Sequence, residues 1–307
     1  MDDFSGLSAV KSYKSLVLDP RDAEPDDILP YLEDASVTTL QLAGFRDVDL
    51  SALPRITSTL RLKRCGIEDL SSMPENWLAM TIELEDCPAL RSLEGVQNQS
   101  SLGKKGTGTI LIRNCPLLFD WSALAGMDLH ALMIENCLSL PDFSDLKMTK
   151  LRIANVPDVT DFSFLDAVDA SSSHNFELVG LEAGNLAPLR RFGGQYLTVS
   201  SPLEDQAKEL VQAGNFNEYH VENGEGGWEP DLSAFTLNSS EELEELPKAL
   251  LKRITRLCIA GDRLYDPDKF GIREDWSSKD RNGAPALFLE NWETGEESPV
   301  EAASSPI

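Results

Sequence analysis

Cysteine and histidine are the residue types in this chain best suited to chemistry, because they ligate metals and act as nucleophiles or bases. Four of the five cysteines recur at steps of 22, 28 and 22 residues, and each closes an apolar phrase. A thiol inside an apolar phrase is expected to be buried and inert. The spacing therefore predicts reduced structural thiols and no disulfide framework, at Cys65, Cys87, Cys115 and Cys137.

The remaining candidates form no catalytic or metal-binding pattern. His130, His174 and His220 are far apart in the sequence, and none has the spacing of a ligand pair. Cys258 lies in an apolar run that predicts a buried strand position. The polar stretch 97–107 is rich in Gly and Lys, but it lacks the residue order of a phosphate-binding loop and predicts a protruding loop. We therefore expect no enzyme activity, no metal and no cofactor.

The cysteines belong to copies of one short phrase of alternating apolar and polar residues. The phrase from Ile110 to Cys115 returns 22 residues later between Leu132 and Cys137. Alternation predicts a strand, and this period is typical of a solenoid with one strand and a tight return in each turn. Six clear copies begin at Leu40, Leu60, Ile82, Ile110, Leu132 and Leu151, and weaker copies begin at Phe176, Tyr196 and Tyr219.

The segment after each phrase repeats as well. Apolar residues fall there at steps of three, which favours a 3₁₀ return because its side chains align at i and i+3. The unit Asp-apolar-Ser recurs within it, and we expect its side-chain oxygens to accept hydrogen bonds from backbone N–H groups instead of binding metal. The six units begin at Asp49, Asp69, Asp120, Asp142, Asp161 and Asp231.

The complete unit, L-x-L-x-x-C-x-x-L-x-D-[LFW]-S-x-L, resembles the 22-residue leucine-rich repeat of the internalin and phosphatase-regulator type over residues 37–200. The resemblance implies an α/β fold, namely a right-handed solenoid with a parallel concave β-sheet, short 3₁₀ or irregular convex returns, and a cap at each end. It also implies that a partner binds on the concave face. Cysteine holds the ladder position, where it is a poor donor and behaves as a small hydrophobe.

The composition predicts four parts. A solenoid needs a polar cover at its ends, and an acidic segment rich in Ser, Pro and Ala favours disorder. A Ser-capped stretch with early Glu and late Lys and Arg predicts a helix over 239–254. The predicted parts are an N-terminal cap at 1–36, the solenoid at 37–223, a C-terminal capping region at 224–292 and a disordered acidic tail at 293–307.

Strand alternation assigns a side to each residue of a phrase. The Leu and Ile residues point into the core, so the residues between them face the concave side. Neighbouring strands lie about 4.8 Å apart, which pairs Arg61 with Glu83 and places Leu111 beside Met133, exposed among charges. The predicted partner-binding residues are Arg61, Lys63, Glu83, Glu85, Leu111, Arg113, Met133, Glu135 and Arg152.

Two interpretations of this face stay open. The alternating charges could form an inter-strand salt ladder that only keeps the sheet soluble and in register, since exposed ion pairs contribute about 0–1 kcal/mol each. Alternatively, Leu111 and Met133 form the apolar centre of a contact patch with a charged rim.

The net charge of −25 over 307 residues repels nucleic acid and anionic membranes, so we expect neither as a partner. The chain begins with Met1, Asp2 and Asp3, with no basic and apolar leader, and no apolar run approaches the roughly 18 residues of a membrane helix. Together with the reduced thiols, these features predict a cytoplasmic monomer.

The leading hypothesis is a non-catalytic protein-protein interaction scaffold that holds a protein partner on its concave face, its acidic C-terminal flank, or both. Residues 201–307 carry 23 acidic and 10 basic residues, so the partner could be basic. The first alternative is an acidic inhibitor or immunity-type protein that neutralises a basic enzyme or toxin. The second is a secreted bacterial effector.

Overall fold

The chain divides into two compact units, Met1–Trp228 and Glu229–Ile307. A computed structural model describes residues 8–18, 28–45, 48–74, 78–99, 101–102, 106–157, 159–170, 173–181 and 184–222, together with the backbone of six short strands between residues 235 and 299.

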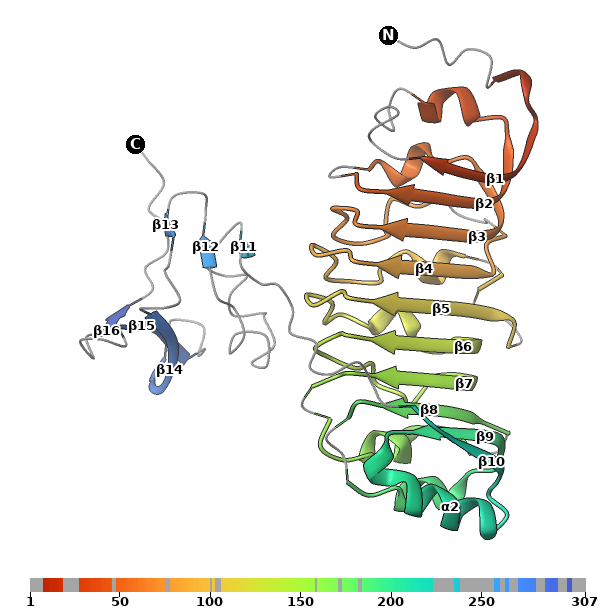
Figure 1. Ribbon diagram of the computed structural model, residues 1–307. Coiled ribbons are helices and arrows are strands. Elements are labelled where there is room, and N and C mark those ends of the chain that lie inside the picture. The colour runs from red at the N-terminus through yellow and green to blue at the C-terminus, as the bar shows by residue number, and fades with distance from the viewer. Residues whose placement is uncertain are drawn as a thin grey trace. The chain divides into compact units, whose positions relative to one another are not determined.

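The first unit is built on one ten-stranded sheet in which the strands follow one another in chain order (Figure 1). Every pair of neighbouring strands is parallel, and the short helices lie behind the sheet in this view (Figure 1). One strand and one return per turn is the arrangement of a repeat solenoid, as predicted. The strands are β1 (Ser12–Leu18), β2 (Ser36–Ala43), β3 (Arg55–Lys63), β4 (Thr81–Glu85), β5 (Gly108–Arg113), β6 (Asp128–Glu135), β7 (Lys147–Ala154), β8 (Asn175–Val179), β9 (Gly194–Val199) and β10 (Phe216–Val221).

All nine copies of the phrase, the three weak ones included, fall on strands β2 to β10. β1 lies inside the range predicted as a cap and joins the sheet as its first strand. The first apolar residue of each of the six clear copies is fully buried, as alternation predicts. The core is therefore a stack of equivalent layers, one from each turn.

Most returns contain 3₁₀ helix, as the steps of three predict. The 3₁₀ helices between strands are η3 (Leu50–Ala52), η4 (Val96–Asn98), η5 (Ser122–Leu124), η6 (Ser163–Ala167), η7 (Ala187–Arg191) and η8 (Ser201–Leu203), and η2 (Leu29–Leu32) precedes β2. In five of the Asp-apolar-Ser units the Asp carboxylate accepts the Ser backbone N–H at 2.8–3.0 Å, which confirms their turn role. The sixth unit, at Asp231, lies outside the described residues.

Two segments differ from the sequence prediction. The turn between β9 and β10 contains an unpredicted α-helix, α2 (Glu204–Gln212), which begins with two acidic residues that favour a helix N-terminus and buries Ala207 and Leu210. The described part of the 97–107 stretch is less detached than a protruding loop, because Leu102 is fully buried and Gly108 packs against its carbonyl, and residues 100 and 103–105 lie outside the described residues. Within the described part of the chain, no helix is long and apolar enough to cross a membrane.

The second unit contains two three-stranded sheets. β12 falls where a strand is predicted, around Cys258, and β16 lies inside the 293–307 segment whose composition predicts disorder. The helix predicted at 239–254 lies outside the described residues, and the capping role of this region stays a prediction. The strands are β11 (Phe235–Leu237), β12 (Leu257–Ile259), β13 (Arg263–Leu264), β14 (Phe270–Lys279), β15 (Pro285–Asn291) and β16 (Glu297–Pro299).

Candidate functional site

The four repeated thiols form a buried column inside the solenoid. Cys65, Cys87, Cys115 and Cys137 are all free and fully buried, as predicted. Burial raises the pKa of the Cys65 and Cys137 thiols to about 12. The Cys87 thiol and burial together hold the pKa of Cys115 well above its usual value. A raised pKa keeps the thiols of Cys65, Cys115 and Cys137 protonated near neutral pH, which suits a structural position and not a nucleophile.

These thiols do more than fill space. Three of the Sγ atoms lie 3.5–3.8 Å from a main-chain carbonyl oxygen of the preceding turn, within reach of a weak S–H···O hydrogen bond. These long contacts agree with a poor donor, and they give each buried thiol an acceptor in place of water. The thiol and carbonyl pairs are Cys65 with Leu42, Cys87 with Leu62, and Cys115 with Leu84.

A second column, directly before the cysteines, was not predicted. Its residues have left-handed backbone conformation, with φ between 50° and 55° at Arg64, Asp86, Asn114, Asn136 and Asn155. The Asn114 amide donates to Asp86 at 2.5 Å and the Asn136 amide donates to Asn114 at 2.6 Å. The signal for it was the recurring Asn and Asp, the residue types that best tolerate this conformation. These two amide hydrogen bonds join the residues that follow β4, β5 and β6.

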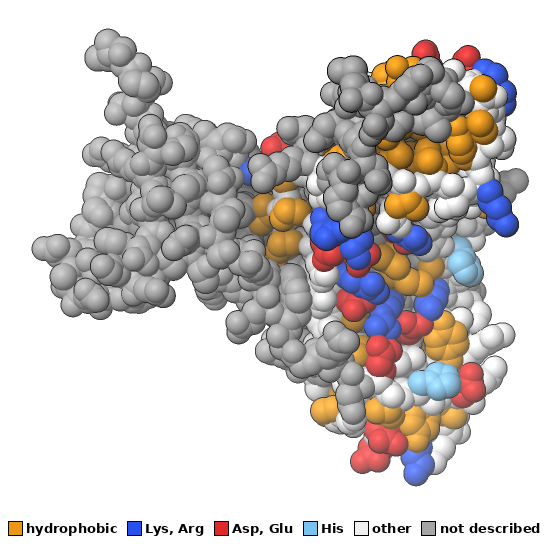
Figure 2. Space-filling model, turned by 45° about the horizontal axis from the view of Figure 1, so that its top comes forward, with side chains coloured by type: hydrophobic (Ala, Val, Ile, Leu, Met, Phe, Trp, Pro, Cys, Tyr) orange, Lys and Arg blue, Asp and Glu red, His pale blue; other side chains and the backbone are white. Residues whose placement is uncertain are grey.

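We call the side of the sheet that faces away from the core the open sheet face. The sequence predicts that this face is concave. Register pairs Arg61 with Glu83, and Leu111 with Met133. Figure 2 shows basic and acidic side chains alternating in a band with hydrophobic side chains beside them. All predicted partner-binding residues therefore share one surface, in a row through Arg61, Glu83, Leu111, Met133 and Arg152 and a second row through Lys63, Glu85, Arg113 and Glu135.

In strands β3 to β6 the charges pair one strand at a time. Arg61 donates to Glu83 through Nε and through Nη2, the latter at 3.0 Å, as predicted, and its Nη1 donates to Gln41 at 3.3 Å. Lys63 Nζ lies 2.8 Å from a Glu85 carboxylate oxygen. Further along, Arg113 Nη2 lies 3.1 Å from a Glu135 carboxylate oxygen. Each of these partly exposed pairs contributes about 0–1 kcal/mol.

In strands β7 to β10 the charges form a branched network around Arg152. Its guanidinium bonds Glu177 at 2.9 Å and Glu222 at 2.8 and 3.1 Å, and lies 3.8 Å from Glu135. Lys150 also pairs with Glu177, at 2.6 Å. Hydrogen bonds from Arg152 hold the pKa of Glu222 below its usual value.

Three members of this network were not predicted from the sequence. Lys150 lies two residues before Arg152, so alternation could have placed both on one face. Tyr196, whose hydroxyl lies 3.2 Å from Glu177, comes from one of the weak phrases. Glu222 follows the last strand of the sheet and is 70 residues from Arg152. No periodic signal could have predicted that last contact.

Leu111 and Met133 lie side by side but are half-buried, not fully exposed as predicted. They sit on neighbouring strands between charged residues at positions 83 and 152 of the same row, so long side chains flank both ends of the pair. The large hydrophobic residues that are exposed in the described part of the chain are Val10, Val17, Tyr31, Leu78, Met80 and Val221.

The histidines remain apart in the structure. His130 is exposed beside Thr149, and His174 is buried against Phe176 and Phe192. His220 lies 3.6 Å from Glu218. Among the described residues, no group of three or more His, Cys, Asp or Glu side chains could hold a metal ion.

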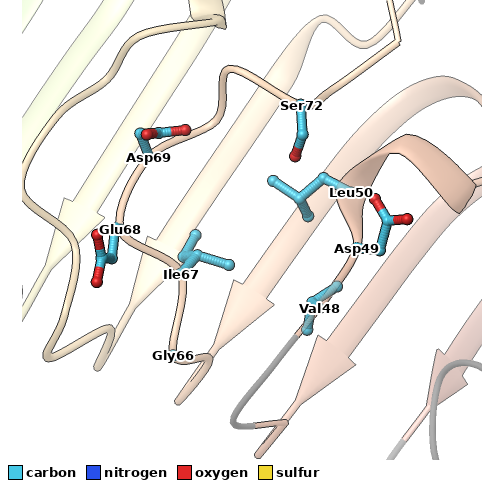
Figure 3. A pocket seen from close by; sticks show the side chains of 8 residues that line it. All are labelled: Val48, Asp49, Leu50, Gly66, Ile67, Glu68, Asp69 and Ser72. Carbon is cyan, nitrogen blue, oxygen red and sulfur yellow. The ribbon is translucent and has the colours of Figure 1, made fainter.

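An acidic hollow of about 380 Å³ lies between η3 and the turn after β3. Asp49, Glu68 and Asp69 line it together with aliphatic side chains. Figure 3 shows the Asp49 and Asp69 carboxylates apart, with Leu50 and Ile67 between them in this view. Both carboxylates bind the Ser residue two positions on, so this hollow follows from the repeated turns and is not a converging ligand set.

No protein-family model, curated protein or solved structure matches the chain. Function must therefore be argued from the geometry. The described side chains of the open sheet face form a surface with a half-buried apolar pair and a rim of paired charges. Such a surface can recognise another molecule by shape and charge.

Proposed function

We propose that the chain is a non-catalytic protein-binding scaffold whose open sheet face receives a protein partner. The repeated unit supports a solenoid of the leucine-rich-repeat type, with a concave sheet, capped ends and right-handed crossovers. That hand is nearly universal for parallel strands joined through a return. The proposal includes a cytoplasmic monomer without a cofactor.

The observation that carries the proposal is the apolar pair of Leu111 and Met133. The pair lies in the middle of the ten-stranded sheet, because Leu111 is on β5 and Met133 is on β6. Each cation of the predicted row and rim already has a carboxylate partner within the chain. Burial of an apolar centre within a ring of satisfied polar groups is how most interfaces gain their affinity.

The test replaces Leu111 and Met133 together by Asp. A partner is first identified by affinity capture from native lysate with mass spectrometry, and its binding is then measured by calorimetry. We expect the double variant to keep the circular dichroism spectrum of the wild type and to lose partner binding, because two carboxylates would be desolvated at the contact.

The matched control is Leu78→Asp with Met80→Asp. These residues are exposed and apolar, and they lie just before β4 instead of on the open sheet face. This variant should bind as the wild type does. Unchanged binding by the Leu111 and Met133 variant would reject the open sheet face as the contact surface.

The net charge of −25 supports a second candidate, an acidic inhibitor or immunity-type protein that neutralises a basic enzyme or toxin. Long-range attraction to a basic partner accelerates association and is screened by salt. This candidate predicts a tight stoichiometric complex whose association rate falls steeply as salt is added. An association rate that does not respond to salt would count against it.

A further inference from the structure

Arg152 differs from the other basic residues of the open sheet face in where its partner comes from. Arg61 and Lys63 on β3, and Arg113 on β5, each bind a carboxylate on the next strand. Arg152 on β7 also binds the next strand through Glu177, but its two-pronged contact goes to Glu222, beyond the end of β10.

The contact between Arg152 and Glu222 has the geometry of a bound carboxylate. Nη1 of Arg152 lies 3.1 Å from one oxygen of Glu222, and Nη2 lies 2.8 Å from the other. Two parallel N–H···O bonds are the arrangement in which arginine recognises a carboxylate most specifically. The guanidinium is thus already oriented for an acidic group that arrives from outside its own strand pair.

Of the two carboxylates that accept hydrogen bonds from Arg152, Glu222 is the one that another carboxylate can replace. Glu177 has a side chain only 14% exposed and is also held by Lys150 and Tyr196. Glu222 has a side chain 45% exposed and follows an edge strand that pairs only with β9 among the described strands. A competing carboxylate would therefore displace Glu222 and leave Glu177 in place.

Arg152 is also next to the proposed apolar centre. Register aligns Leu111 with Met133 and Met133 with Arg152 on three successive strands. Since neighbouring strands lie about 4.8 Å apart, the apolar pair and the guanidinium form one short row of about 10 Å. A single segment of a partner can contact all three side chains.

We propose that this row recognises a protein segment in which an acidic residue stands near an apolar anchor, and that Glu222 occupies the acidic position in the free protein. The apolar side chain seats on Leu111 and Met133, and the carboxylate takes the place of Glu222 on Arg152. This inference rests on the proposed function, since it concerns the same surface. It adds which residue types the partner presents there, and that Glu222 competes with the partner for Arg152.

The test pans a displayed library of random peptides against the full-length Glu222→Ala variant. Enriched peptides are synthesised, and their dissociation constants are measured for the wild type and for Glu222→Ala. We expect Asp or Glu beside a large apolar residue, and binding about tenfold tighter to Glu222→Ala than to the wild type, the value of one charge-assisted hydrogen bond. In the Glu222→Ala background, Arg152→Met should remove the preference for the acidic residue.

Glu85→Ala is the matched control, because it removes an open-face carboxylate from Lys63 and leaves Arg152 untouched; it should give no gain in affinity. Peptides that need Leu111 and Met133 but ignore Arg152 and Glu222 would overturn the inference and leave the proposed function standing. Enrichment of basic peptides would also overturn it. If no enriched peptide depends on Leu111 and Met133, the proposed function fails as well.

Discussion

The two halves of the open sheet face use the same charged residue types in different ways. In strands β3 to β6, each basic residue has its main partner one strand away, in the register that the repeat dictates. In strands β7 to β10, Arg152 joins carboxylates from three other parts of the chain, at Glu135, Glu177 and Glu222. The first half is a ladder and the second is a hub.

The difference teaches what periodicity can and cannot do for a surface. A ladder of ion pairs between neighbouring strands follows from the repeat alone, and any one ion pair can be lost with little effect on the others. A hub requires a residue that the repeat does not supply, here Glu222 beyond the edge strand. A residue held from several sides loses less side-chain entropy for each additional bond, so the hub should be the stronger of the two.

The largest expected effect is from Arg152→Met, which keeps the aliphatic stem and removes the cation. The Arg152 side chain of the wild type is only 17% exposed and donates hydrogen bonds to two carboxylates. We expect the free energy of unfolding to fall by about 1.5 kcal/mol, because charge-assisted hydrogen bonds are lost and acidic groups are left close together. Urea denaturation followed by circular dichroism measures the change.

Arg61→Met is the control from the ladder, because Arg61 also binds a carboxylate through two groups. It should lower the free energy of unfolding by about 0.5 kcal/mol. Equal losses for Arg61→Met and Arg152→Met would mean that the hub contributes nothing beyond an ordinary rung.

A smaller effect concerns pH. Arg152 lowers the pKa of Glu222 in the folded protein from its ordinary value of 4.5. A lowered folded-state pKa means that the contribution is present above the unfolded value and is lost as pH falls through the folded value. The free energy of unfolding should therefore decrease more between neutral pH and about pH 3 in the wild type than in Glu222→Gln.

The same substitution in an Arg152→Met background isolates the cause. Without the guanidinium, burial and the nearby charge of Glu177 both raise the pKa of Glu222, so Glu222→Gln should no longer lessen the loss of unfolding free energy at low pH. If Glu222→Gln still lessens the loss of unfolding free energy at low pH in this background, the effect belongs to another group.

Much of the ladder could be predicted from the sequence. The phrases indicate which residues face outward, and equal offsets from the start of each phrase indicate which residues meet, as Leu111 meets Met133. The same periodicity placed the four cysteines in the core. These features follow from alternation and strand spacing, which are local and repeated.

Features that depend on three-dimensional surroundings could not be predicted in this way. Alternation gives the direction of a side chain but not what lies beside it, so Leu111 was expected to be more exposed than it is. Ala154 and Val179 lie on the outward columns and are nevertheless buried. The contact of Glu222 depends on how the chain leaves β10, to which no repeat corresponds.

The smallest expected effect is the coupling between Lys63 and Glu85 in the ladder. A double-mutant cycle with Lys63→Met and Glu85→Gln should give an interaction energy below about 0.5 kcal/mol, since the Lys63 ammonium is flexible, partly exposed and also lies 3.9 Å from Asp86. The corresponding cycle for Arg152 and Glu222 should give a larger value, because its two-pronged contact fixes both side chains. A coupling above about 1 kcal/mol for Lys63 and Glu85 would contradict the distinction, because a single rung would then be as strong as the branched network.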